Sequence, residues 1–383
     1  MAEITLKING NSTLVGTMIP VGSRNEPDNI KGISHFLEHS LFKGTKNRDK
    51  NQIKRELEEY GAKFNAWTSE EHTLYYAVIA NQYVDIARNL IDDMVENSVF
   101  PEEEIEKEKQ VVLQELEMYV DDPYSYIFEL AQREIFEKTS GLHIPIIGTK
   151  ESVTNITRDD LVKYYNEHYK NPIKLTVGGV KTEAKNRVYL NKQFELENRA
   201  YNAEDRVVTR KGIHQANIVL TGSFYLNNLR EQYMLQLFGA IMNGFSGRFF
   251  DVIREQHNLV YHTFFYYQIH SCGTVQYWGY AGLTPDKVAF AKQLMEEQLT
   301  KEITQAEFDF AKKKWIGQCR LSLDSKEDIT RLLIHSIMLG RDYNVMLNNY
   351  ESIINTITLQ DMNTFAKKLL EKQPKLVALV PEN

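Results

Sequence analysis

One short stretch combines two imidazoles and a carboxylate, His35-Phe36-Leu37-Glu38-His39. On a helix, residues four apart lie on one face, so His35 and His39 would project together with Glu38 beside them. This set suits a catalytic Zn²⁺, because the imidazoles supply two nitrogen ligands and the carboxylate supplies a base for the attacking water. The order H-x-x-E-H is the inverted form of the common metalloprotease motif. We therefore predict a zinc site with Glu38 as general base, against the plainer alternative of two ordinary surface histidines.

A catalytic zinc site needs a third protein ligand, and the predicted helix 102–120 offers several carboxylates. The apolar stripe of this helix consists of Ile105, Val112, Leu116 and Tyr119. At about 100° per residue, Glu108 and Glu115 flank this stripe, whereas Glu117 lies about 160° from Glu115, toward solvent. A carboxylate beside a buried stripe is costly unless it is paired or bound to metal. Glu108 and Glu115 are therefore both candidate ligands, and Glu117 is a poorer one.

Two similar sets of predicted elements surround these residues, one in each half of the chain. The first half has predicted strands at 3–8, 12–21, 63–67, 72–79 and 174–180, and predicted helices at 32–42, 49–60, 83–97, 102–120, 124–136 and 158–169. The second half has predicted strands at 216–224, 259–271, 273–281 and 375–380, and predicted helices at 231–242, 286–299, 304–323, 327–339 and 359–370. We therefore predict an α+β fold of two tandem, structurally similar domains, each an antiparallel-rich sheet with helices packed on one face. The predicted limits are 1–185 for the zinc-binding domain, 186–206 for the connection and 207–383 for the second domain.

The composition of the 383 residues narrows the class of protein. Hydrophobic residues make up 42% and charged residues 25%, as in soluble globular proteins. The net charge of −7 argues against a nucleic-acid binder, which would usually be basic. The chain has no run of 18 apolar residues, so no membrane span is expected. Cys272 and Cys319 are far apart and residues 1–11 lack the pattern of a secretory leader, so we expect a cytoplasmic protein.

Residues 32–45 read GISHFLEHSLFKGT, and this stretch resembles the zinc-binding segment of the pitrilysin family of zinc metallopeptidases. That family includes insulin-degrading enzyme and the mitochondrial processing peptidase, and this chain resembles a short two-domain bacterial-type member. The spacing between His39 and Glu115 is similar to that between the family's second and third zinc ligands. The resemblance therefore implies a metal site of His35, His39 and Glu115, with Glu108 matching a family glutamate that orients the metal ligands.

Residues 64–68, FNAWT, are similar to the family's edge strand beside the zinc. In the family, a substrate peptide adds to this edge as an extra strand held by main-chain hydrogen bonds. The resemblance implies that Asn65 and Ala66 bind substrate and that Trp67 and Phe42 line side-chain pockets. For Trp67 the alternative is a core aromatic residue.

Arg254 and Tyr261 match a second family feature, an arginine and a tyrosine seven residues apart. The resemblance implies that these side chains contact the substrate main chain and stabilise the developing oxyanion. Without the resemblance, a surface arginine and a core tyrosine would be the better interpretation.

The expected activity is that of a zinc metalloendopeptidase with one Zn²⁺ per chain, acting on peptides or unfolded segments. Family members enclose substrate in a closed chamber built from four such half-units, and this chain resembles two. We therefore expect a homodimer, with a heterodimer of related chains as the alternative. A rival hypothesis is a non-catalytic peptide-binding or structural subunit of the same fold. A weaker one is a phosphate binder built on the turn 243–247, which lacks a following Lys-Ser/Thr.

Overall fold

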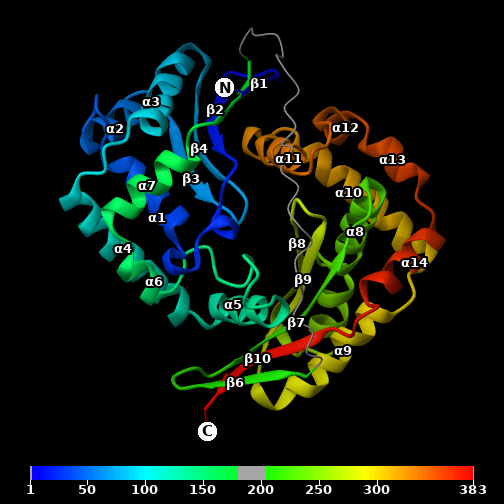
Figure 1. Cartoon of the computed structure of the whole chain (residues 1–383). Coiled ribbons are helices and arrows are strands. Elements are labelled where there is room, and N and C mark those ends of the chain that lie inside the picture. The colour runs from blue at the N-terminus through cyan, green and yellow to red at the C-terminus, as the bar shows by residue number, and fades with distance from the viewer. Residues whose placement is uncertain (1, 180–203, 383) are drawn as a thin grey trace. The chain divides into compact units, whose positions relative to one another are not determined.

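The computed structural model describes residues 2–179 and 204–382. They pack as two compact units, each built on a five-stranded sheet (Figure 1). The first unit contains residues 2–119, 144–179 and 323–343, and the second contains 120–143, 204–322 and 344–382. Each unit therefore takes one segment from the opposite half of the chain.

The sheet of the first unit has the strand order β1-β5-β2-β4-β3. Its strands are β1 (Ala2–Lys7), β2 (Ser12–Ile19), β3 (Lys63–Thr68), β4 (Thr73–Ala80) and β5 (Ile173–Gly178). β1 and β5 run parallel, and all other neighbours run antiparallel. β2 and β4 are buried along most of their length, as expected for strands that are covered on both faces. β3 ends the sheet, so one row of its main-chain groups faces away from β4.

Helices cover both faces of this first sheet. The helices of this unit are α1 (Ile33–Ser40), α2 (Lys50–Glu58), α3 (Val84–Asn97), α4 (Glu102–Asp121), α6 (Lys150–Asn155), α7 (Arg158–His168) and α11 (Lys326–Met338). Of these, α1, α2, α3 and α11 pack against the strands. Neighbouring residues on a strand point to opposite faces. Tyr75 of β4 contacts Phe42, which follows α1, whereas Tyr76 contacts Trp67, over which Arg331 of α11 lies. The helix α11, drawn in orange in Figure 1, therefore covers the face opposite α1.

The sheet of the second unit has the order β6-β10-β7-β9-β8. Its strands are β6 (Arg206–Arg210), β7 (Ala216–Tyr225), β8 (Val260–Ile269), β9 (Thr274–Leu283) and β10 (Lys375–Pro381), with β6 and β10 parallel. Its helices are α5 (Pro123–Ile135), α8 (Leu229–Met242), α9 (Val288–Thr300), α10 (Gln305–Ser322), α12 (Tyr343–Asn348), α13 (Tyr350–Thr356) and α14 (Leu359–Leu369), with a π-helical segment at Phe249–Gln256. α5 packs against β7 and β10 through an apolar cluster that includes Ile127 and Val219.

Capping residues mark where several helices begin. Asp49, Thr149, Thr157 and Thr358 each accept a hydrogen bond from the main chain three residues on, and the side chain at that position bonds back. These reciprocal bonds satisfy amide groups that have no partner inside the helix. They set the start of α2, α6, α7 and α14.

The predicted fold class, α+β with two tandem similar units, is confirmed. The sheets are mixed, because one parallel pair joins the antiparallel strands in each. Each sheet also carries a helix from the opposite half of the chain, α11 on the first and α5 on the second. The prediction that helices pack on one face is therefore wrong for the first sheet, because α11 covers the face opposite α1. The predicted connection 186–206 falls largely outside the described residues, so the domain limits stay a prediction. Within the described ranges, none of the helices has the length and apolar character needed to span a membrane.

Candidate metal centre

The helix α1 begins at a close approach between two loops. Gly32 precedes it with φ of 93°, and a Cβ atom there would lie 2.5 Å from the carbonyl oxygen of Ile147. The buried carboxylate of Glu26 accepts hydrogen bonds from the main-chain N–H groups of Gly32 and Ser34, both at 2.7 Å. These bonds satisfy amides at the start of the helix, where negative charge is favoured. Burial raises the pKa of Glu26 to about 7.

Two helices bring the three expected ligands together. His35 and His39 project from α1, and Glu115 projects from α4. Glu115 Oε1 lies 3.8 Å from His35 Nε2, and Glu115 Oε2 lies 3.5 Å from His39 Nε2. One ligand atom from each residue lies within 4.8 Å of the others. In α4, Ile105, Val112 and Leu116 are buried as predicted, but Tyr119 is 49% exposed and does not belong to the stripe.

These donors fit Zn²⁺. Ligand atoms at about 2.0–2.2 Å from a tetrahedral metal lie roughly 3.3–3.6 Å apart, close to the two separations above. Burial, followed by the nearby His39, lowers the pKa of His35 to about 3, so this imidazole is neutral and keeps a lone pair for a metal. Two nitrogens and one carboxylate oxygen are a donor set used in catalytic zinc sites, which keep the fourth position open.

Glu108 does not join the ligand cluster but holds one of its members. Its Oε1 lies 2.8 Å from His39 Nδ1, and its Oε2 lies 2.5 Å from Lys43 Nζ. A carboxylate on Nδ1 leaves Nε2 of the same ring for the metal and fixes the ring orientation. The two candidates left open by the helical-face argument thus occupy different places: Glu115 between the imidazoles and Glu108 behind His39.

Glu38 lies between the ligand helix and the edge strand. Its Oε2 accepts a hydrogen bond from Thr68 Oγ1, at the end of β3, at 2.5 Å. Burial, opposed by the bond from Thr68, raises the pKa of Glu38. Glu38 directly precedes the expected ligand His39 in the sequence, and its carboxylate lies at the end of β3. A peptide bound along β3 would therefore reach this carboxylate.

The main chain of β3 offers part of its edge for strand addition. The Ser69 N–H donates to the His72 carbonyl at 2.8 Å, and in an antiparallel ladder bonded pairs alternate. The pairs Trp67–Leu74 and Asn65–Tyr76 are therefore bonded, and the main-chain groups of Ala66 point outward. The Ala66 N–H donates to the neighbouring Asn65 Oδ1 at 2.9 Å, a local bond that an added strand would replace.

The two predicted pocket residues lie on opposite faces of the sheet. Phe42 packs on Phe64 with ring centroids 5.0 Å apart, on the face of α1. Trp67 packs on Tyr76 with centroids 5.3 Å apart, on the face of α11. Both are partly buried. A single pocket cannot contain both side chains, so they would contact alternate residues of a bound peptide.

Arg254 and Tyr261 belong to the second unit. The guanidinium of Arg254, in the π-helical segment, lies over the ring of Phe250 at 4.5 Å and 3.7 Å from Glu255. Tyr261 falls in β8, at a register irregularity in its pairing with β9 between Val260 and Thr263. The joint action of this pair with the metal ligands stays a prediction.

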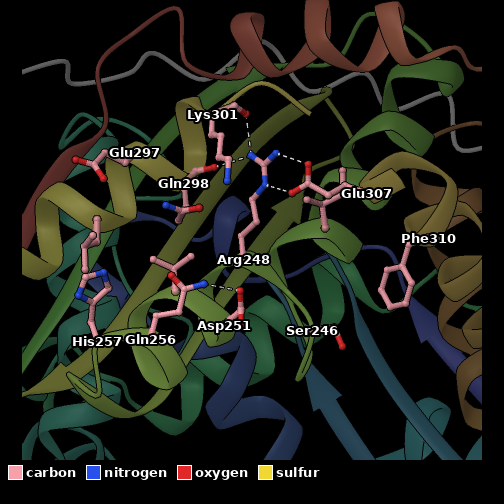
Figure 2. A pocket seen from close by; sticks show the side chains of 13 residues that line it. Ser246, Arg248, Asp251, Gln256, His257, Glu297, Gln298, Lys301, Glu307 and Phe310 are labelled. Atoms are coloured by element: carbon pink, nitrogen blue, oxygen red, sulfur yellow. Dashed lines mark hydrogen bonds and ion pairs between the residues drawn. The ribbon is translucent and has the colours of Figure 1, made fainter. Parts of the chain in front are cut away.

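A pocket of about 490 Å³ in the second unit contains other polar groups (Figure 2). Arg248 crosses it and is 5% exposed. Its guanidinium donates to both carboxylate oxygens of Glu307 at 2.7 and 2.9 Å, and to the carbonyls of Gln298, Lys301 and Glu302. Arg248 therefore ties α9 to α10.

The turn 243–247 lies beside this pocket, and phosphate binding there stays a prediction. The side chain of Asn243 exchanges two bonds with the main chain of Phe265, at 2.6 and 2.8 Å. It therefore anchors the turn to β8.

Three residues around the metal centre were not singled out from the sequence. Lys43 neutralises Glu108, Thr68 holds Glu38, and Glu26 anchors the start of α1. Lys43 follows His39 by four residues, so helical spacing could have indicated it. Glu26 precedes the motif in a loop and carries no periodic signal.

Comparison with known proteins gives a consistent result. Residues 4–150 match the family model described as insulinase (peptidase family M16), and residues 155–314 match that of the peptidase M16 inactive domain. An uncharacterized zinc protease of Rickettsia bellii is 31% identical over 97% of this chain and 93% of its own length. The beta subunit of the human mitochondrial-processing peptidase is 38% identical over 43% of this chain and 34% of its own. A Helicobacter pylori protease structure has the same fold, with a TM-score of 0.87 at 22% identity, covering 98% of this chain and 96% of that one.

Proposed function

Because the chain belongs to the insulinase family of peptidases, M16, we propose that it is a zinc-dependent endopeptidase. Full-length relatives are named zinc proteases, which supports peptide hydrolysis as the reaction class. The observation that carries the proposal is the convergence of His35, His39 and Glu115 with Glu38 beside them. A structural zinc site would need four protein ligands and no adjacent base.

His35, His39 and Glu115 would hold one Zn²⁺ per chain. When bound, the metal supplies Lewis-acid polarisation of the scissile carbonyl and lowers the pKa of a water. Glu38 acts as general base: it takes the proton of the attacking water and delivers it to the leaving amine. Thr68 orients the Glu38 carboxylate, and Glu108 orients the His39 ring.

Substrate would bind as an extended strand along β3. The outward main-chain groups of Ala66 offer hydrogen bonds, and Phe42 and Trp67 contact alternate side chains on the two faces. This mode requires extended chain, so peptides and unfolded segments are the substrate class. Arg254 and Tyr261 would bind the substrate main chain and stabilise the oxyanion.

We further propose a homodimer that closes a chamber around the substrate, because two similar units per chain are half of the four that build such a chamber in the family. A cytoplasmic location is part of the proposal, since two cysteines far apart in the sequence are typical of proteins from a reducing compartment.

The test measures cleavage of a quenched-fluorescent peptide mixture by the zinc-loaded protein, with and without chelator, and by Glu38→Gln. Glu117→Gln is the matched control, since Glu117 lies on α4 and pairs with Lys150 in solvent. We expect Glu38→Gln to bind zinc normally and to lose roughly 10²–10⁴-fold in rate, and Glu117→Gln to cleave like the wild type. Cleavage by Glu38→Gln at the wild-type rate would refute the assignment. Intact peptides and no bound zinc in every sample would instead support the non-catalytic subunit, whereas intact peptides with zinc bound would point to a missing partner or a very narrow substrate.

A further inference from the structure

An arginine from the second half of the chain lies beside the edge strand of the metal-binding unit. The Cζ of Arg331, on α11, lies 4.4 Å from the ring centroid of Trp67 in β3. This is within the range of a cation–π contact. Both residues belong to the same compact unit. Arg331 is thus positioned on the face of β3 opposite the metal ligands.

The ring of Trp67 is fixed from two other sides. Its Nε1 lies 3.2 Å from His72 Nε2, and Ser69 Oγ holds the other nitrogen of that imidazole at 2.8 Å. Tyr76 contacts the ring edge-on, with centroids 5.3 Å apart and planes at 65°. A fixed indole gives the guanidinium a defined position, and a stacked guanidinium keeps its N–H edge available for hydrogen bonds.

Arg331 is not held in a close ion pair within the described part of the chain. Arg331 is exposed and forms no ion pair within 4.0 Å of an acidic group there. The acidic residue near Arg331 is Glu327, one helical turn earlier. Burial chiefly raises the pKa of the Tyr76 hydroxyl; the charge of Glu327 raises it further and the charge of Arg331 lowers it. Lys63, at the start of β3, is exposed and shares the face of Asn65 and Trp67. Arg331 and Lys63 therefore place two cations on this face, with the acid Glu327 near Arg331.

Strand pairing determines which substrate residue meets Arg331. Trp67 is hydrogen-bonded to β4, so a peptide residue opposite it forms a non-hydrogen-bonded pair, in which side chains on the shared face lie closest. The side chain of that residue points toward α11, whereas its two neighbours point toward α1 and Glu38.

We propose that Arg331 is a specificity-determining residue that selects a carboxylate side chain, Asp or Glu, at the substrate position opposite Trp67. The inference rests on the proposed peptidase function, since it requires a peptide bound along β3. Arg331 would bind the carboxylate through its N–H edge in two parallel hydrogen bonds. The net charge of the chain would then be a poor guide to the peptides it prefers.

The experiment uses a quenched peptide in which a single Glu replaces Gln at each position in turn, with cut sites identified by mass spectrometry. In the wild type, we expect Glu at one position relative to the cut bond to raise kcat/KM roughly three- to tenfold over Gln. Arg331→Gln should bring that ratio to about one while cleaving the Gln peptide at a rate within about twofold of the wild type. Arg331→Glu should favour Lys at the same position. Arg331→Lys, which keeps the charge but not the planar fork, should fall between.

Arg55→Gln is the control, because Arg55 is an exposed arginine on α2, where it lines a surface hollow with Glu56 and Asn89. It should keep the wild-type ratio. A ratio that Arg331→Gln leaves unchanged, or a ratio of one at every position in the wild type, overturns the proposal. A carboxylate bound by Arg331 could come from a side chain or from the C-terminus of the peptide, and peptides with amidated C-termini distinguish the two. A preference that is lost on amidation would assign the binding to the terminal carboxylate and overturn selection of a side chain.

A binding experiment distinguishes failure of the proposed peptidase function from failure of the proposed role of Arg331. If the wild type cleaves none of these peptides, fluorescence anisotropy of the labelled Glu and Gln peptides on zinc-loaded protein makes the same comparison. Tighter binding of the Glu peptide that Arg331→Gln removes supports the role of Arg331 without catalysis. Equal binding of both peptides, or no binding, overturns it. Melting temperatures of all variants establish that each is folded.

Discussion

Replacing Glu108 by Gln should weaken zinc binding without removing a ligand. The carboxylate uses both oxygens, one toward His39 Nδ1 at 2.8 Å and one toward Lys43 Nζ at 2.5 Å. Both partners are donors, and an amide has only one acceptor oxygen, so the substituted side chain can satisfy one of them and presents an N–H group to the other. The loss is therefore one charge-assisted hydrogen bond in a site where the Glu108 side chain is 11% exposed, about 1.5–3 kcal/mol.

If that loss acts on the metal-bound state, the zinc Kd rises roughly 10- to 150-fold. This overlaps the roughly 10- to 100-fold effect typical of residues that hold a metal-ligating histidine. The assay is competition with a chromophoric chelator at fixed pH, with Glu117→Gln as control. Glu117 also pairs with a lysine at 2.7 Å, but its side chain is 54% exposed, so we expect no change in Kd. A Glu108→Gln Kd within about threefold of the wild-type value would refute the reasoning, because the carboxylate would then contribute nothing to the orientation of His39.

Two further predictions concern the start of α1. Gly32→Ala combines a positive φ with a Cβ that would lie 2.5 Å from the Ile147 carbonyl oxygen, so it should destabilise the protein by about 1–3 kcal/mol and weaken zinc binding. Gly61→Ala is the control for backbone strain alone, because Gly61 has φ of 65° and a Cβ there would meet no atom within 4 Å. Equal losses of stability in the two variants would count against a role for the contact with Ile147. The pKa of Glu26 is raised by burial to about 7 in the folded state from about 4.5 unfolded, so its stabilising contribution is fully present below pH 4.5 and is lost as the pH rises through 7. The difference in unfolding free energy between wild type and Glu26→Gln, followed by denaturant unfolding, should therefore fall by on the order of 3 kcal/mol from pH 4.5 to pH 8; a difference that does not change with pH would contradict the shift.

Periodicity was sufficient to predict the faces of the helices in the metal centre. The i, i+4 spacing predicted that His35 and His39 project together, and rotation along α4 reduced its acidic residues to Glu108 and Glu115. It could not separate these two, because their roles depend on how α4 packs against α1, more than 60 residues earlier in the chain. The resemblance to a known family supplied the choice of Glu115. Thr68 and Glu26 are likewise linked to the centre only by tertiary contacts.

The strand and helix order was also predictable, but the partner of each helix was not. An amphipathic pattern indicates which side of α5 or α11 is apolar, without indicating which sheet covers it. The local order of the elements favoured packing each helix within its own half. The short segments β6, α6, α12 and α13 were missed, because stretches of five to seven residues give too few repeats for a period to emerge.

The placement of α11 has a consequence for how the protein is made. The sheet of the metal-binding unit is complete in sequence at Gly178, yet the helix that covers its second face ends at Met338. During synthesis at about 5–20 residues per second, the ribosome needs roughly 8–32 seconds to add this stretch. During that interval, the surface of β2 and β5 that α11 later contacts is open to water or to a chaperone. A truncated gene ending near residue 206 would leave it open permanently, and its product should aggregate.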